Sequence, residues 1–222
     1  MKRRVFISRN PIDCEAIRAF LPIEFEVIAQ SLIETKGISY ETPIPLTDWI
    51  FFSSSNAARH FFEKHPQLDQ QKIAAIGEAT AQAIRKHHAV DFIGNASDIT
   101  DSAYRFAESI GTQTVLFPIA ADSLKHIQSA LPAEQVIDLP VYTTTEKSQH
   151  VAPCDVYVFS SPSNVRSFFR SNNSAFRTDA SCIAFGEATR DELNKQGIQD
   201  VLIPHSLEPH SIAHTIIQAV QG

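Results

Sequence analysis

Short apolar runs alternate with helical patterns along the whole chain. Eight runs show little polar alternation, as expected for strands covered on both faces: residues 4–8, 48–52, 72–76, 114–118, 135–139, 155–159, 182–185 and 200–203. Between them, apolar side chains recur at helical spacing, for example at Ala103, Phe106, Ala107 and Ile110. Strands that alternate with amphipathic helices predict an α/β fold with parallel sheets.

The chain contains an internal repeat. The stretch "DWIFFSSSNAARHFF" (48–62) aligns with "DVYVFSSPSNVRSFF" (155–169). The tetrapeptide GEAT follows in both copies, at 77–80 and 186–189, and each copy continues with a loop and an amphipathic helix. This matched order predicts two similar α/β lobes.

Two segments outside these blocks share a strand–helix–strand pattern. They are "RVFISRNPIDCEAIRAFLPIEFEVIAQ" near the start and "TVLFPIAADSLKHIQSALPAEQVIDLPVY" in the middle of the chain. The simplest way to complete both lobes is circular: the first segment joins the C-terminal copy, and the middle segment joins the first copy. The chain must then cross between the lobes twice.

This arrangement gives explicit domain bounds. Residues 1–33 plus 145–222 would form one discontinuous α/β domain, and residues 37–139 an inserted second domain. The crossings would be linkers at 29–38 and 139–147, extended enough to pair as two strands. Because pockets favour domain interfaces, we expect a ligand cleft between the two domains.

Composition and charge exclude several classes of protein. The net charge of −6 argues against a nucleic-acid-binding face made from bulk positive charge. The basic N-terminus lacks the apolar region of a signal peptide, and no window approaches the ~20 apolar residues of a membrane span. The cysteines Cys14, Cys154 and Cys182 have no zinc spacing and are expected to be reduced and buried. We therefore expect a cytoplasmic protein with no membrane and no nucleic-acid partner.

The repeated loops are suited to binding anions. In an open parallel sheet, ligands bind beyond the carboxyl ends of the strands, and each of these loops opens a helix there. Free N–H groups at helix starts, serine and threonine hydroxyls and close-approaching glycines can all hold an anion. The candidate binding residues are Ser53, Ser54, Ser55, Gly77, Thr80, Ser97, Ser161, Ser163, Gly186 and Thr189. For any single loop the alternative is capping without a ligand.

Other chemical motifs are weak or missing. The chain has no GxGxxG, no GxxxxGK[ST] and no GxSxG motif. His210 and His214 could share a helix face, but no acidic or cysteine partner completes a metal site, so no metal is expected. Tyr142 lies in the second crossing, where its phenol either packs against the linker or donates a hydrogen bond to a ligand.

The ordered motifs "IFFSSSNAA", "IAAIGEATA", "LPVYTT", "YVFSSPSNV" and "IAFGEATRDEL" resemble the uroporphyrinogen-III synthase family over essentially the whole chain. The resemblance implies two α/β domains joined by a two-stranded linker. It implies a monomeric, cofactor-independent and metal-independent hydro-lyase of heme biosynthesis. The substrate would be hydroxymethylbilane, a linear tetrapyrrole with eight carboxylates, which is dehydrated and cyclised with inversion of ring D. Transient contact with hydroxymethylbilane synthase is a further expectation.

The resemblance also assigns roles to residues. Tyr142 matches the tyrosine of the family and would be catalytic, assisting departure of the substrate hydroxyl. Thr80 and Thr189 match the family's G-x-x-T threonines, and the serine loops would hold substrate carboxylates. The alternative is a non-catalytic two-lobed sensor that closes on a polycarboxylate. A fusion of two receiver-like domains is disfavoured, because no strand ends in a phosphoacceptor aspartate.

Overall fold

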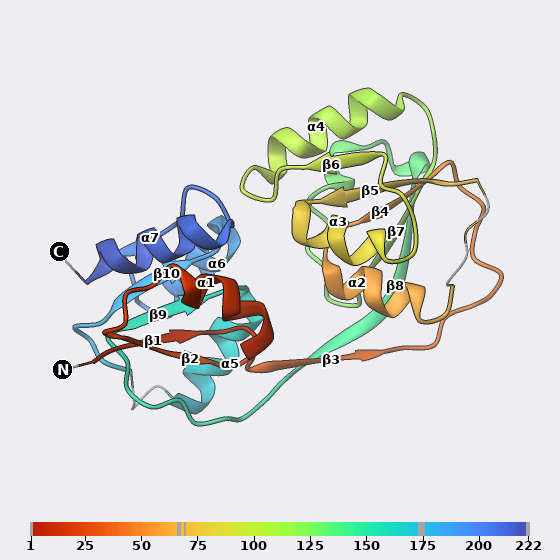
Figure 1. Cartoon of the computed structure of the whole chain (residues 1–222). Coiled ribbons are helices and arrows are strands. Elements are labelled where there is room, and N and C mark those ends of the chain that lie inside the picture. Colours follow the sequence, from red (N-terminus) through yellow and green to blue (C-terminus); the bar gives the residue numbers. More distant parts are fainter. Residues whose placement is uncertain (1, 66–67, 69, 173–175, 221–222) are drawn as a thin grey trace. The chain divides into compact units, whose positions relative to one another are not determined.

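The chain forms two compact units, described by a computed structural model over residues 2–65, 68, 70–172 and 176–220 (Figure 1). Unit 1 consists of Met1–Glu34 and Thr145–Gly222, and unit 2 of Thr35–Thr144. The chain passes from one unit to the other within two strands, β3 (Ile33–Gly37) and β8 (Val136–Glu146). No helix in the described part of the chain has the length and apolar character that a membrane crossing requires.

Unit 1 is built on a five-stranded parallel sheet in the order β11-β10-β9-β1-β2. The strands are β1 (Arg3–Ile7), β2 (Phe25–Ala29), β9 (Val156–Phe159), β10 (Ser181–Ala184) and β11 (Val201–Leu202). The helices are α1 (Glu15–Ala19), α5 (Pro162–Asn172), α6 (Glu187–Lys195) and α7 (Pro209–Ala219). Strand β1, from the start of the chain, thus pairs with β9 of the second repeat copy.

Alternate side chains of the unit 1 strands enter two separate apolar layers. Phe6 packs with Tyr157 and Phe159 beneath α5 and α6. Val5 and Ile7, on the other face of β1, pack against α1 and α7. Because both faces are covered by helices, the strands need apolar residues at every position. This explains the uninterrupted apolar runs in the sequence.

Unit 2 contains a six-stranded sheet in the order β3-β8-β7-β4-β5-β6. Its remaining strands are β4 (Trp49–Phe52), β5 (Lys72–Ile76), β6 (Phe92–Gly94) and β7 (Val115–Ala120). Its helices are α2 (Ser55–Phe62), α3 (Glu78–Arg85) and α4 (Ile99–Ile110). Figure 1 shows α4 on the face of the sheet opposite α2 and α3. Ile50 and Phe52 accordingly pack with α2 and α3, and Phe51 packs with Phe106 of α4.

Strands β3 and β8 run antiparallel. The backbone N–H of Ile38 donates to the carbonyl of Val141, and the N–H of Lys147 donates to the carbonyl of Leu32. Between these ends, the hydroxyls of Thr143 and Thr145 donate to β3 carbonyls. Residue numbers that rise along β3 thus pair with residue numbers that fall along β8.

The predicted α/β class with parallel sheets is confirmed, and each of the eight apolar runs overlaps a strand. The helix expected between residues 118 and 135 is wrong. This segment instead contains two 3₁₀ turns, Gln128–Ala130 and Ala133–Gln135. Lys125 has a left-handed φ of 55°, which interrupts any helix, yet Ile127 and Leu131 are still buried at helical spacing.

Candidate functional site

The candidate residues of unit 2 lie at the carboxyl edge of neighbouring parallel strands. The serine loop follows β4, the first GEAT turn follows β5, and the loop with Ser97 follows β6. Ser54 caps α2, because its Oγ accepts a hydrogen bond from the N–H of Ala57 at 3.1 Å. Within the described residues, the hydroxyls of Ser53, Ser55 and Ser97 make no hydrogen bond.

Tyr142 joins this edge through Ser54. The two hydroxyl oxygens lie 3.3 Å apart and form a hydrogen bond. The Tyr142 ring belongs to the apolar core beneath α2 and stacks on His60, with ring centroids 5.3 Å apart. Only 7% of the residue is exposed, and this burial raises the pKa of the phenol above its ordinary value. Tyr142 is therefore a neutral hydrogen-bond donor at physiological pH.

His60 is held behind Tyr142 by a polar network. Its Nε2 lies 3.0 Å from the Thr35 hydroxyl and 3.3 Å from the Arg59 guanidinium. Its Nδ1 lies 3.3 Å from a carboxylate oxygen of Glu63. Arg59 also donates to the Thr35 hydroxyl at 2.6 Å. The imidazole under the Tyr142 ring is thus fixed in orientation.

The two GEAT threonines are buried residues whose hydroxyls are free. Thr80 and Thr189 are 5% and 4% exposed, in the first turns of α3 and α6. Neither hydroxyl has a hydrogen-bond partner among the residues that the structure describes. Neither hydroxyl oxygen is among the fully buried polar atoms that lack a partner in the described chain, so each can be reached by water or a ligand. Both threonines are therefore available to bind a ligand.

The two GEAT glycines are not equivalent. Gly77 has φ 73° and ψ 159°, a conformation restricted to glycine, and a Cβ there would lie 2.8 Å from the Cβ of Ala96. Gly186 has φ 172°, which any residue adopts, and a Cβ there would meet nothing within 4 Å. Only Gly77 therefore uses the conformational freedom of glycine. The space beside Gly186 is open.

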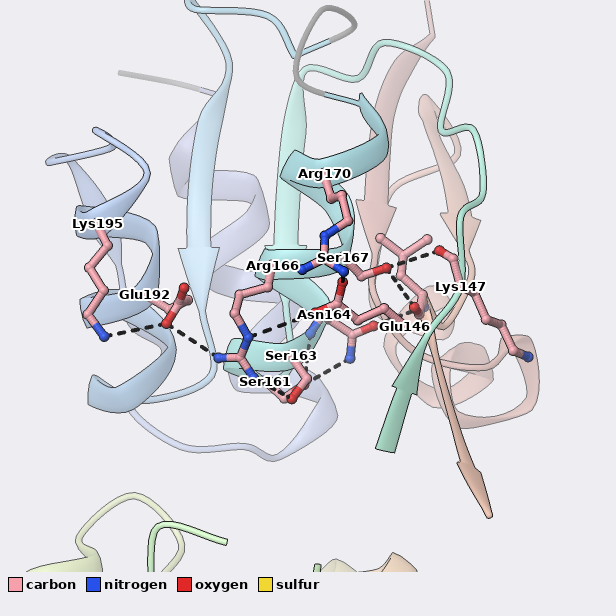
Figure 2. Close-up of polar contacts among 11 residues, drawn as sticks. Glu146, Lys147, Ser161, Ser163, Asn164, Arg166, Ser167, Arg170, Glu192 and Lys195 are labelled. Carbon is pink, nitrogen blue, oxygen red and sulfur yellow. Dashed lines mark hydrogen bonds and ion pairs between the residues drawn. The ribbon is translucent and has the colours of Figure 1, made fainter. Parts of the chain in front are cut away.

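The candidate serines of unit 1 lie in the loop between β9 and α5. Ser161 accepts hydrogen bonds from both nitrogens of Asn164, the backbone N–H at 3.3 Å and the side-chain amide at 2.9 Å. It therefore has the same capping role as Ser54, its counterpart in the repeat. Figure 2 shows these contacts at the start of α5.

Ser163 is already engaged within unit 1. Its hydroxyl accepts from Arg166 at 3.1 Å, and Arg166 forms an ion pair with Glu192 at 3.4 Å (Figure 2). A second carboxylate, Glu146, lies 4.0 Å from the same guanidinium. The charge of Arg166 is thus compensated, and the Ser163 hydroxyl already accepts one hydrogen bond within unit 1.

Helix α5 also fastens the chain segments on either side of the linker. The side-chain oxygen of Asn164 accepts from the buried N–H of Leu32 at 2.9 Å. The Ser167 hydroxyl donates to the carbonyls of Leu32 and Lys147, at 2.8 and 3.0 Å (Figure 2). Sequence reasoning missed these anchors, because a buried polar residue in a helix carries no signal of which backbone group outside the helix it contacts.

The GEAT glutamates pair with arginines of their own helices, Glu78 with Arg85 and Glu187 with Arg190. They also lie in first turns, where negative charge favours the helix dipole. Both observations assign them a structural role. Among the described residues, no group of histidine, cysteine and acidic side chains could hold a metal ion.

Comparison with known proteins supplies independent information. The family model for uroporphyrinogen-III synthase HemD matches residues 20–213. The structure is similar to uroporphyrinogen-III synthetase from Helicobacter pylori, with 17% identity, a TM-score of 0.66, and coverage of 98% of this chain and 100% of that one. It is also similar to a mutant uroporphyrinogen III synthase from the extremely thermophilic bacterium Thermus thermophilus, with 16% identity, a TM-score of 0.60, and 99% of both chains covered. No curated protein sequence matches the chain.

Proposed function

The chain belongs to the uroporphyrinogen-III synthase family, and from this premise we propose that it cyclises hydroxymethylbilane to uroporphyrinogen III with Tyr142 assisting the loss of water. Family membership places the enzyme in tetrapyrrole biosynthesis. The observation that carries the assignment of Tyr142 is its hydrogen bond to Ser54 at the carboxyl edge of the unit 2 sheet.

The proposed reaction balances without a cofactor. The carbon–oxygen bond of the substrate's hydroxymethyl group breaks, and the hydroxyl group takes up a proton and leaves as water. The electron-deficient carbon left behind is attacked by ring D, which is inverted through a spiro intermediate before the ring closes and a carbon-bound proton is lost. The product is the substrate minus one water, so no oxidant or reductant is consumed. This balance supports a cofactor-independent lyase.

Tyr142 is suited to the first of these steps as a hydrogen-bond donor. Burial raises the pKa of its phenol, so the group retains its proton at neutral pH. Negative charge develops on the departing oxygen, and a positioned O–H group stabilises it there more strongly than in the bound substrate. The His60 stack and the Ser54 hydroxyl hold the phenol in place, which limits the reorganisation that this contact requires.

The helix starts are suited to holding the substrate carboxylates. Free backbone N–H groups and the positive end of the helix dipole favour anions there. Thr80 and Thr189 are buried residues that add hydroxyls without a partner among the described residues. These local groups decide binding at contact distance, so the net charge of −6 is no obstacle to an anionic substrate.

The experiment compares the wild type with Tyr142→Phe, supplied with hydroxymethylbilane by hydroxymethylbilane synthase. Products are oxidised to uroporphyrins and the isomers are separated. We expect Tyr142→Phe to lower kcat by roughly tenfold or more, up to about 10³-fold, because one transition-state donor is removed. Tyr104→Phe is the matched control, since Tyr104 is 67% exposed on α4.

Each outcome of this experiment is informative. Isomer III from the wild type, with slow formation by Tyr142→Phe and a normal rate for Tyr104→Phe, supports the proposal. Full activity of Tyr142→Phe removes the role of the phenol. Tight binding of the substrate without any isomer III would instead favour a polycarboxylate sensor.

A further inference from the structure

Arg9 is a partly buried cation at the carboxyl edge of the unit 1 sheet. It lies two residues after β1, and its guanidinium carbon sits 4.6 Å from the centroid of the Phe185 ring. Within the described chain, its side chain forms no hydrogen bond and no ion pair. The guanidinium thus lies over the face of an aromatic ring while all five of its N–H donors stay free among the described residues.

The other engaged arginines of unit 1 differ in this respect. Arg4, Arg166, Arg170, Arg177 and Arg190 each pair with at least one carboxylate. The negative charge of Asp13 favours the charged form of Arg9 from a distance. No carboxylate lies within ion-pair distance of Arg9 in the described part of the chain. Burial lowers the pKa of the Arg9 guanidinium, yet an arginine stays charged in proteins. The positive charge is thus partly desolvated, and it has no direct ion-pair partner among the described residues.

The surroundings of Arg9 add positive potential and free donors. Phe185 leads directly into Gly186, the residue before α6, so the guanidinium lies beside a helix start. The space at Gly186 is open, and Thr189 in the first turn of α6 is buried with a hydroxyl that has no described partner. A cation and the positive end of a helix dipole repel each other, and an anion near both relieves that repulsion. The local positive potential therefore favours binding of an anionic ligand.

We propose that Arg9 binds a carboxylate of the substrate, together with the N–H groups and Thr189 hydroxyl at the start of α6. A guanidinium with no other partner among the described residues can offer two parallel N–H groups, the geometry that a carboxylate accepts in bidentate form. The inference rests on the proposed function, because that function supplies a substrate with eight carboxylates. It makes Arg9 a binding residue, with no part in the departure of water.

The test compares Arg9→Gln and Arg9→Lys with the wild type in the coupled isomer assay. Arg9→Gln is expected to raise KM about 10–100-fold, the range for losing a charge-assisted hydrogen bond, with kcat changed much less. Arg9→Lys keeps the positive charge but lacks the paired N–H donors of a guanidinium, so its KM should lie between those of the wild type and Arg9→Gln. The control is Arg3→Gln, an exposed arginine at the opposite end of β1, which should leave KM unchanged.

A second measurement does not depend on turnover. Uroporphyrin III, added as an eight-carboxylate probe, is titrated against each variant by fluorescence. Weaker binding by Arg9→Gln than by Arg3→Gln supports the proposal, and equal binding with equal KM overturns it. Should Arg9→Gln fail to fold, Phe185→Leu removes the stacking surface instead, and binding as tight as that of the wild type would then overturn the proposal. A wild type that forms no isomer III would overturn the proposed function instead, whereas an active wild type with an unaffected Arg9→Gln overturns only this inference.

Discussion

Alanine at Gly77 and at Gly186 should have opposite consequences, although both glycines begin the same tetrapeptide. At Gly77 the backbone has φ 73°, and the new Cβ would lie 2.8 Å from the Cβ of Ala96. At Gly186 the backbone is extended and nothing lies within 4 Å of the new Cβ. The sequence change is identical, so any difference in stability must come from the local structure.

The two effects can be sized. Holding alanine in a glycine-only conformation costs about 1–3 kcal/mol, and crowding adds a similar amount that the Ala96 loop can partly relieve. We therefore expect Gly77→Ala to lower the free energy of unfolding by about 2–4 kcal/mol. Gly186→Ala should leave it within about 0.5 kcal/mol or raise it by up to about 1 kcal/mol, because alanine restricts the unfolded chain.

Urea titration of the wild type and both variants, followed by circular dichroism, measures these differences. Equal destabilisation by the two substitutions would refute the reasoning, as would a neutral Gly77→Ala. Activity provides a further contrast, because the open space at Gly186 lies beside the proposed carboxylate site. Gly186→Ala should raise KM while the fold keeps its stability.

Three further outcomes are expected. His60→Ala should lower the free energy of unfolding by about 2–4 kcal/mol. His60→Phe keeps the stack on the Tyr142 ring and should lower it by only about 0.5–1.5 kcal/mol. Equal losses in urea titrations would contradict a stabilising role for the stack. Burial raises the pKa of Cys154 and Cys182 to about 12, so both thiols stay protonated at about pH 8. Iodoacetamide should therefore label them only after unfolding. Rapid labelling of the native protein, measured by mass spectrometry, would contradict this. Asn164→Ala leaves the buried N–H of Leu32 without an acceptor and should cost about 1–3 kcal/mol in thermal or urea unfolding, so an unchanged stability would show that another group replaces the amide.

The fold class could be predicted because unit 1 and unit 2 bury both faces of their strands, which requires continuous apolar runs. The segment after β7 shows the limit of this signal. Ile127 and Leu131 have helical spacing and are buried, but the chain satisfies that spacing with turns around the left-handed Lys125. Apolar spacing reports burial, and backbone conformation decides the element.

The candidate site could be predicted only as far as local features determine it. Ser54 and Ser161 cap their helices as their position before a helix indicates. The difference between Gly77 and Gly186 could not be predicted, because it depends on Ala96 from another loop. The same holds for Arg9, since the absence of a counterion among its described neighbours is a property of the folded chain.

The most direct test of the central claim is the isomer composition formed by the wild-type protein from hydroxymethylbilane. Without enzyme, the bilane closes without inverting ring D and gives isomer I. We predict that the protein shifts the product predominantly to isomer III, in proportion to its concentration and without added metal or cofactor. A product that remains isomer I at every protein concentration would contradict the assignment.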